Sequence, residues 1–288
     1  MTDSYKFGLI GHHIAYSLSR DVFAAIFAVS GKRGRFEIYD VAPEQLDSRF
    51  NNVVAAGIQG LSVTIPHKQT IIGHLDEVDA VAQVLGAVNS VAVDSGHIRG
   101  FNTDCYGFSL ALRPFKDQLA RRRALVLGSG GAARAAIYCL CTDYQIRNFT
   151  VLSRSTASVT EFQTAATKIM PDVDIVAVTG DGIRNSFWDE QDYGIIVNCT
   201  PLGGWHYPDR SPLPAALQLH AGQIYYDVNY NDGNKLVQQA RESGLTALDG
   251  RLMLVGQAVR SFAIWTTNSV AVEPVYEMVF GRKAAERQ

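Results

Sequence analysis

Two segments in the first part of the chain carry residue types suited to moving a proton. Lys68 closes the run that begins at Gly60, and Asp104 closes the run Gly100-Phe101-Asn102-Thr103-Asp104. Hydride transfer to a carbonyl needs a proton donor beside the oxygen that becomes negative, and a lysine ammonium positioned by a carboxylate can serve. Each residue also has an ordinary interpretation, because Lys68 suits a solvated first turn and Asp104 suits a helix cap. The pair is a candidate for proton transfer.

A second chemical signal is a turn of small residues that follows an apolar strand and opens a helical stretch: Gly128, Ser129, Gly130, Gly131, Ala132 and Ala133. In this context Gly128 permits a tight turn, Gly130 lets the backbone approach a pyrophosphate, and Ala133 replaces a third glycine for close helix packing. The amino terminus of the helix then presents free N–H groups to phosphates. The turn predicts a dinucleotide-binding site, against the alternative of an ordinary glycine-rich connection.

The residues after the next strand bear on which dinucleotide binds. An acidic residue there would favour NAD, because it hydrogen-bonds the ribose hydroxyls and repels a 2′-phosphate. This chain has no acid at that position and instead places Arg154 between Ser153 and Ser155. A guanidinium and two hydroxyls suit a phosphate, although Arg154 alone is also compatible with a plain surface arginine. We expect NADP, with NAD left open.

The elements that must position these residues alternate between strand and helix, which indicates an α/β fold. In the first part we expect strands at 6–10, 36–41 and 60–65, helices at 21–30, 44–56 and near His67, and a hairpin over 87–100. A polar side chain of Asn102-Thr103-Asp104 could cap a helix over 106–112. This part should contain a mostly parallel sheet.

The second part repeats the alternation from residue 124 onward. Its expected elements are strands at 124–127, 149–152, 174–178, 194–198 and 223–228 and helices at 132–141, 158–170 and 253–267. This order is typical of a Rossmann-type doubly wound nucleotide-binding domain.

Composition favours a small-molecule partner. The chain has 288 residues, of which 47% are hydrophobic, and a formal charge of −2, so it suits two globular domains without the charge for binding nucleic acid or an acidic membrane. Its four cysteines match neither a zinc site nor a disulfide framework, and no metal is expected. The amino terminus lacks the pattern of a signal peptide, and no apolar run is long enough to cross a membrane, so we expect a soluble cytoplasmic protein.

Six ordered motifs resemble the shikimate dehydrogenase family over some 240 residues, from the first loop to the last long helix. They are Ser17-Leu18-Ser19, Val63 to Lys68, Gly86-Ala87-Val88-Asn89, Asn102-Thr103-Asp104, Gly128 to Ala133, and Asp249-Gly250 through Met253 to Gln257. The resemblance implies a substrate-binding domain over 1–104 and 248–288 and an NADP-binding domain over 105–247. It implies oxidation of shikimate to 3-dehydroshikimate with NADP, in aromatic amino acid and chorismate biosynthesis, by a monomer or homodimer.

The resemblance also implies roles for individual residues. Ser17 and Ser19 would hold the substrate carboxylate, Thr64, Asn89 and Gln257 its ring hydroxyls, and Lys68 and Asp104 would be the catalytic pair. Tyr230 joins the substrate-binding residues through the segment Asp227 to Tyr230. Thr200, in the loop Asn198 to Gly203, and Met253 would lie beside the cofactor. Neutral hydroxyls and amides are suitable partners for a polyhydroxylated acid.

The sequence departs from the family pattern at three positions. Tyr16 and Arg20 replace a histidine and a proline around the serines, and Ser62 replaces an asparagine, which leaves the preference for ring substituents open. A quinate/shikimate dehydrogenase that uses NAD is therefore one alternative. A regulator that binds the cofactor without catalysis is another, against which the presence of both Lys68 and Asp104 argues. His67 is not expected to act in catalysis, because neighbours on a helix face different directions.

Overall fold

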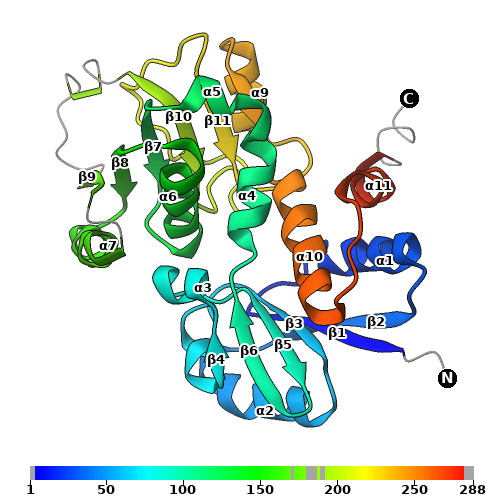
Figure 1. The fold of residues 1–288 in the computed structure, drawn as a ribbon. Helices are drawn as coiled ribbons and strands as arrows, with labels where there is room; N and C mark the ends of the chain where they lie inside the picture. The colour runs from blue at the N-terminus through cyan, green and yellow to red at the C-terminus, as the bar shows by residue number, and fades with distance from the viewer. Residues whose placement is uncertain (1–3, 170–171, 180–186, 189–191, 282–288) are drawn as a thin grey trace. The chain divides into compact units, whose positions relative to one another are not determined.

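The computed structural model describes residues 4–169, 172–179, 187–188 and 192–281 and divides into two compact units (Figure 1). Unit 1 comprises Met1–Gly107 and Leu254–Gln288, and unit 2 comprises Phe108–Met253. Across the described ranges, no helix is both long and apolar enough to span a bilayer.

Unit 1 is built on a six-stranded sheet in the order β2-β1-β3-β5-β6-β4. The strands are β1 (Tyr5–Gly11), β2 (Gly34–Asp40), β3 (Gly60–Val63), β4 (Glu77–Val78), β5 (Ser90–Asp94) and β6 (His97–Phe101). β1 pairs in parallel with β2 and β3, β4 pairs in parallel with β6, and β5 runs antiparallel to β3 and β6. β5 and β6 form the expected hairpin, which confirms that prediction.

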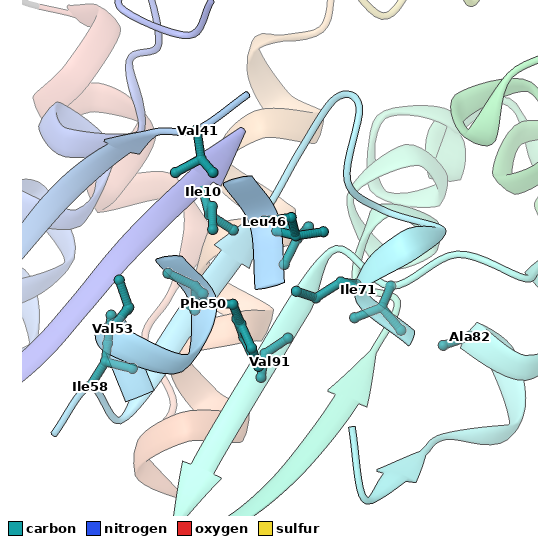
Figure 2. Close-up of a cluster of buried hydrophobic side chains, with 12 residues drawn as sticks. Ile10, Val41, Leu46, Phe50, Val53, Ile58, Ile71, Ala82 and Val91 are labelled. Atoms are coloured by element: carbon teal, nitrogen blue, oxygen red, sulfur yellow. The ribbon is translucent and has the colours of Figure 1, made fainter. Parts of the chain in front are cut away.

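Helices cover both faces of this sheet because its central strands are apolar on both sides. The helices are α1 (Ser19–Ser30), α2 (Leu46–Ala55), α3 (Ala80–Leu85), α10 (Arg251–Thr266) and α11 (Val272–Tyr276). On one face, Phe50 and Val53 of α2 pack with Leu61 and Val63 of β3 in a buried cluster (Figure 2). This cluster fixes the carboxyl end of β3, from which the segment to Lys68 departs.

The opposite face of the sheet is held by aromatic rings from α1 and α10. Trp265 of α10 stacks on Phe23 of α1 with ring centroids 5.3 Å apart, and Phe23 stacks on Phe36 at 4.3 Å. The indole covers Gly60 so closely that a Cβ there would lie 2.1 Å from Trp265. The glycine at the start of β3 therefore lets α10 lie directly on the sheet.

Unit 2 contains a six-stranded, wholly parallel sheet in the order β12-β11-β10-β7-β8-β9. The strands are β7 (Arg123–Leu127), β8 (Asn148–Ser153), β9 (Asp174–Thr179), β10 (Tyr193–Asn198), β11 (Ile224–Asp227) and β12 (Thr246–Leu248). The chain order reverses between β7 and β10, and doubly wound folds bind their ligands at the carboxyl ends of the strands beside such a reversal.

Three described helices of unit 2 connect its parallel strands: α6 (Gly131–Tyr144) links β7 to β8, α7 (Thr156–Ile169) links β8 to β9, and α9 (Lys235–Glu242) links β11 to β12. Two more, α4 (Asp104–Leu112), which begins in unit 1, and α5 (Lys116–Leu119), precede β7. Met170, the last residue of the helix expected over 158–170, lies outside the described residues. The doubly wound prediction is confirmed, and the fold as a whole is α/β.

The helix expected near His67 is wrong. His67 N donates to Thr64 O at 2.9 Å, which closes a turn, and regular structure resumes only in a 3-10 helix, Thr70–His74. The turn is held because the His67 imidazole is buried and its Nε2 lies 2.7 Å from Val41 O. Lys68 therefore follows a turn and does not lie on the first turn of a helix.

Both passages between the units occur inside helices. The boundary that we expected after Asp104 falls after Gly107, within α4, and the return that we expected at residue 248 falls at Leu254, within α10. Met253 is therefore assigned to unit 2 and Gln257 to unit 1.

Candidate active site and dinucleotide site

Lys68 and Asp104 are brought together in unit 1. Lys68 Nζ donates to Asp104 Oδ2 at 2.7 Å, and the two side chains are 21% and 8% exposed. Lys68 is placed by the turn after β3, and Asp104 is the first residue of α4. A nearly buried carboxylate thus holds an ammonium that still reaches solvent, as a positioned proton donor requires.

The second oxygen of Asp104 is fixed by a buried amide. Asn89 Nδ2 donates to Asp104 Oδ1 at 2.8 Å and to Thr103 Oγ1 at 3.0 Å, while Asn89 Oδ1 accepts from Thr103 N at 2.6 Å. Asn89 is 3% exposed. Both of its amide hydrogens are used within the protein, so this geometry makes Asn89 a support for Asp104. A contact between Asn89 and a ring hydroxyl stays a prediction.

The helix cap at the start of α4 comes from Asn102. Asn102 Oδ1 accepts from Asp104 N at 3.1 Å, and Asn102 Nδ2 donates to Ala87 O at 2.9 Å. Because Asn102 satisfies the backbone there, the Asp104 carboxylate is left to hold Lys68 and Asn89.

The serine pair lies where α1 begins. Ser17 Oγ donates to Ser19 Oγ at 3.0 Å and accepts from Ser19 N at 3.2 Å. Ser19 is the first residue of the 12-residue helix α1, whose amino terminus carries a positive partial charge. Two hydroxyls at a helix amino terminus can bind a carboxylate.

The loop that leads to these serines is tied down at its start. His13 N donates to Asp40 Oδ1 at 3.0 Å, and His12 Nδ1 lies 3.1 Å from the same oxygen. The His13 N–H is the main cause that holds the pKa of Asp40 below its usual value, and the His12 contact acts in the same direction. Asp40 therefore anchors the β1 to α1 loop from the end of β2.

The remaining predicted substrate residues are Thr64, Gln257 and Tyr230. Thr64 is partly exposed at the end of β3 and packs against Gly11, and Gln257 Nε2 donates to Leu254 O at 2.8 Å within α10. Tyr230 is partly buried and follows β11 in unit 2. Their roles in substrate binding stay predictions.

Ser62, which replaces the asparagine of the family pattern, is buried and lacks a side-chain hydrogen bond among the described residues. Its side chain is 5% exposed, and its Oγ has no hydrogen-bond partner among the described residues. Thr64 comes directly after the last residue of β3, Val63. A buried hydroxyl without a partner among the described residues thus precedes Thr64 near the end of the strand.

The glycine-rich turn of unit 2 follows β7 at the reversal of strand order. Gly128 has a φ of +104°, and a Cβ there would lie 3.1 Å from Thr200 Cγ2 and 3.3 Å from Cys199 O. At Gly130 and Gly131 a Cβ would meet no atom within 4 Å. The protein's own packing explains glycine at Gly128, whereas at Gly130 and Gly131 that packing does not require glycine.

The loop after β10 faces this turn and is held by a buried polar cluster. Asn198 Oδ1 accepts from both Thr200 N and Thr200 Oγ1, and Asn229 Nδ2 donates to Thr200 O at 2.9 Å. Asp227 accepts from Asn198 Nδ2 at 3.0 Å and from Asn229 N at 3.0 Å. Burial raises the pKa of Asp227, and the hydrogen bonds from Asn229 and Asn198 oppose that shift. The cluster fixes Thr200 beside Gly128.

The predicted cofactor residues after β8 lie at the same edge of the sheet. Ser153 Oγ lies 2.9 Å from Ser129 Oγ, which ties the end of β8 to the glycine-rich turn. Arg154 follows with an exposed side chain, and Ser155 Oγ accepts from Ser158 N at 3.3 Å in the first turn of α7. Ala132 follows Gly131 in α6, and Ala133 is fully buried there.

Sequence reasoning missed several supporting residues. Thr103 and Ser261 support the Lys68 pair, and Asn198, Asp227 and Asn229 shape the Thr200 loop. Asn198 and Asp227 belong to the segments Asn198 to Gly203 and Asp227 to Tyr230. A polar residue at the end of an apolar strand could have indicated that each has a role in the site. Ser261 had no such signal. Within the described residues, no group of three metal-ligating side chains occurs.

A doubly wound nucleotide-binding unit and a unit with a lysine–aspartate pair define the class, a dinucleotide-dependent oxidoreductase. A family model described as the shikimate dehydrogenase substrate binding domain matches residues 9–91. The NADP(+) shikimate dehydrogenase of Methanopyrus kandleri is 36% identical over 279 residues, which cover 94% of this chain and 93% of the relative. The chain belongs to the shikimate dehydrogenase family.

Two solved structures share the whole architecture. Shikimate 5-dehydrogenase from Thermus thermophilus, in complex with NADP(H) and shikimate, is 29% identical with a TM-score of 0.81 and covers 97% of this chain and 99% of its own. Quinate dehydrogenase from Corynebacterium glutamicum, in complex with NAD, is 26% identical with a TM-score of 0.84 and the same coverage. Members with either substrate therefore share this fold.

Proposed function

We propose that this protein is an NADP-dependent shikimate dehydrogenase, which interconverts shikimate and 3-dehydroshikimate by reversible hydride transfer. The observation that carries the proposal is the Lys68–Asp104 pair, at 2.7 Å, in a chain of the shikimate dehydrogenase family. The curated relatives over nearly the full chain are NADP(+) enzymes.

Lys68 acts on the oxygen that changes between hydroxyl and carbonyl. In the oxidation of shikimate, the hydroxyl proton passes to this pair as the hydride leaves the adjacent carbon. In the reverse direction the Lys68 ammonium returns a proton to the oxygen that becomes negative. Asp104 keeps the ammonium oriented, and Asn89 keeps Asp104 oriented.

The remaining polar groups of unit 1 hold the substrate. Ser17 and Ser19 bind its carboxylate with hydroxyls at the amino terminus of α1. Thr64 and Gln257 bind ring hydroxyls, and Tyr230 is a further substrate-binding residue. These are neutral hydrogen-bond partners, so the carboxylate is recognised without a buried counter-charge.

The residues of unit 2 fit a dinucleotide. Gly130 and Gly131 leave room at the amino terminus of α6 for a pyrophosphate, and Arg154 with Ser153 and Ser155 offers a guanidinium and hydroxyls to a 2′-phosphate. Thr200 and Met253 lie at the nicotinamide end of the site. NADP supplies the ring carbon that accepts or returns the hydride.

The deciding experiment compares kcat/KM for shikimate and quinate with NADP and with NAD. The highest value is expected for shikimate with NADP. A clear preference for quinate with NAD would instead identify the quinate/shikimate branch, for which the quinate dehydrogenase neighbour is the supporting observation. Dinucleotide binding without turnover of either substrate would favour a non-catalytic regulator.

A further inference from the structure

The catalytic pair of unit 1 is linked by hydrogen bonds to a serine of the long helix α10. Ser261 Oγ lies 3.0 Å from Thr103 Oγ1, across a separation of 158 residues in sequence. Ser261 is fully buried and Thr103 is 2% exposed. We infer that Ser261 is a positioning residue for the proposed reaction, which acts on Asp104 and Lys68 through Thr103 and Asn89.

The first step of the argument is the geometry of Thr103. Its backbone N–H donates to Asn89 Oδ1 at 2.6 Å, and its Oγ1 contacts both amide atoms, accepting from Nδ2 at 3.0 Å and donating to Oδ1 at 3.3 Å. The backbone contact sets which way the Asn89 amide faces, and the hydroxyl holds the amide in place. The hydroxyl of Thr103 can rotate about its side chain, and the contact with Ser261 restricts that rotation.

The second step is what the orientation of Asn89 does. With its oxygen toward Thr103 N, the amide directs one N–H to Asp104 Oδ1 at 2.8 Å. Asp104 then uses its other oxygen for Lys68 Nζ at 2.7 Å. A rotated amide would turn an oxygen toward the carboxylate, so the orientation of Asn89 is necessary for the placement of Lys68.

The third step concerns α10 itself. Trp265, one turn after Ser261, donates from Nε1 to Ser90 Oγ at 3.0 Å, and Ser90 is the chain neighbour of Asn89. Gln257, one turn before Ser261, lies on the same side of the helix because residues four apart share a face. The helix face that bears the predicted substrate residue Gln257 is therefore bonded to the support of the catalytic pair.

A serine inside a helix more often bonds the carbonyl of the preceding turn and has only a local role. Ser261 Oγ instead contacts the Thr103 side chain. Thr266 offers the contrast, because its buried hydroxyl donates to Phe262 O at 2.7 Å within the same helix. Substituting Ser261 or Thr266 therefore removes one buried hydroxyl from α10, and Thr266 serves as the matched control.

The test is a double-mutant cycle of Ser261→Ala and Thr103→Val, with Thr266→Val as the control, read as kcat, the KM values for shikimate and NADP, and thermal stability. Ser261→Ala should lower kcat by about three- to tenfold, the effect of one hydrogen bond, with the KM for NADP unchanged. Because both residues act through Asn89, the double variant should be no slower than Thr103→Val. Thr266→Val should keep the kcat of the unmodified protein whatever its melting temperature.

Three results would overturn the inference: an unchanged kcat in Ser261→Ala, additive losses in the double variant, or an equal loss of kcat in Thr266→Val. The inference rests on the proposed function, and the two fail differently. If the unmodified protein does not oxidise shikimate, the proposed function is wrong. If it does and Ser261→Ala is equally fast, only the positioning role is wrong.

Discussion

Lys68 Nζ lies 2.7 Å from Asp104 Oδ2, and the carboxylate that holds it is 8% exposed. Its partner, the ammonium, is 21% exposed. This asymmetry leaves the ammonium accessible to a substrate, whereas Asp104 is enclosed by the protein groups that orient it. Lys68 is therefore the member of the pair that we propose contacts the reacting oxygen.

Replacing Lys68 by alanine should lower kcat by about 10²–10⁴, the usual contribution of a positioned proton donor. The dissociation constant for NADP, measured by fluorescence titration, should not change, since the dinucleotide residues lie in unit 2. Asp104→Asn should lower kcat less, because the ammonium remains. A Lys68→Ala protein with nearly full turnover would show that another group transfers the proton.

Arg154→Ala should raise the KM for NADP by about 10- to 100-fold, the effect of a lost hydrogen bond between charged groups. The KM for NAD should stay within about twofold, since NAD has no 2′-phosphate. Arg121→Ala is a suitable control, because Arg121 is also exposed but precedes β7 at the opposite end of the sheet. Equal losses with both cofactors would mean that Arg154 has a general role in the fold.

The doubly wound class of unit 2 could be predicted because most of its strands are short apolar runs and one of them ends in the glycine-rich turn. The fold of unit 1 was predictable in class for the same reason. The segment after Pro66 was not, because the turn depends on His67 bonding Val41 O, a contact across 26 residues. Patterns of neighbouring residues in the sequence do not reveal a contact between residues so far apart.

The sequence allowed the residue types of the candidate site to be predicted. It did not allow the hydrogen bonds between them to be predicted. The Asn102-Thr103-Asp104 motif does not indicate that Asn102 caps α4 while Asp104 holds Lys68. The motif also gives no reason to pair Thr103 with Ser261, 158 residues away. Hydrogen-bond partners follow from tertiary packing, so they had to come from the structure.

Gly130→Val should weaken NADP binding by at least about tenfold while leaving the melting temperature within a few degrees. The reason is that a side chain there meets open space in the protein, and its φ of −83° is accessible to any residue. Gly73→Val is the control, since a Cβ at Gly73 also meets nothing within 4 Å. If Gly130→Val binds NADP normally, the open space does not belong to the pyrophosphate.

Ser62→Ala should leave the free energy of unfolding unchanged or raise it by about 1 kcal/mol, because the variant removes a buried hydroxyl that has no described partner. Ser90→Ala is the matched control on the paired residue of β5. Its Oγ accepts from Trp265 Nε1, so the variant leaves a partly buried indole N–H without this partner and should lose about 1 kcal/mol. Urea denaturation measures both. An equal loss in the two variants would show that Ser62 has a partner of its own.

The contact between Asp40 and the β1 to α1 loop should make the free energy of unfolding depend on pH in acid solution. Its pKa is held below the usual 3.8, chiefly by the His13 N–H, so the folded protein binds this proton less readily than the unfolded chain. The resulting stabilisation is fully present above pH 3.8 and is lost as the pH falls through the lower folded pKa. Asp40→Asn should therefore reduce the free energy of unfolding by a constant amount from about pH 5 to 8, and the difference should shrink in more acidic solution. Urea titrations across this range, repeated in a His12→Asn background that removes the imidazole contact with Asp40, would measure it. A difference that grows as the pH falls would contradict the assignment.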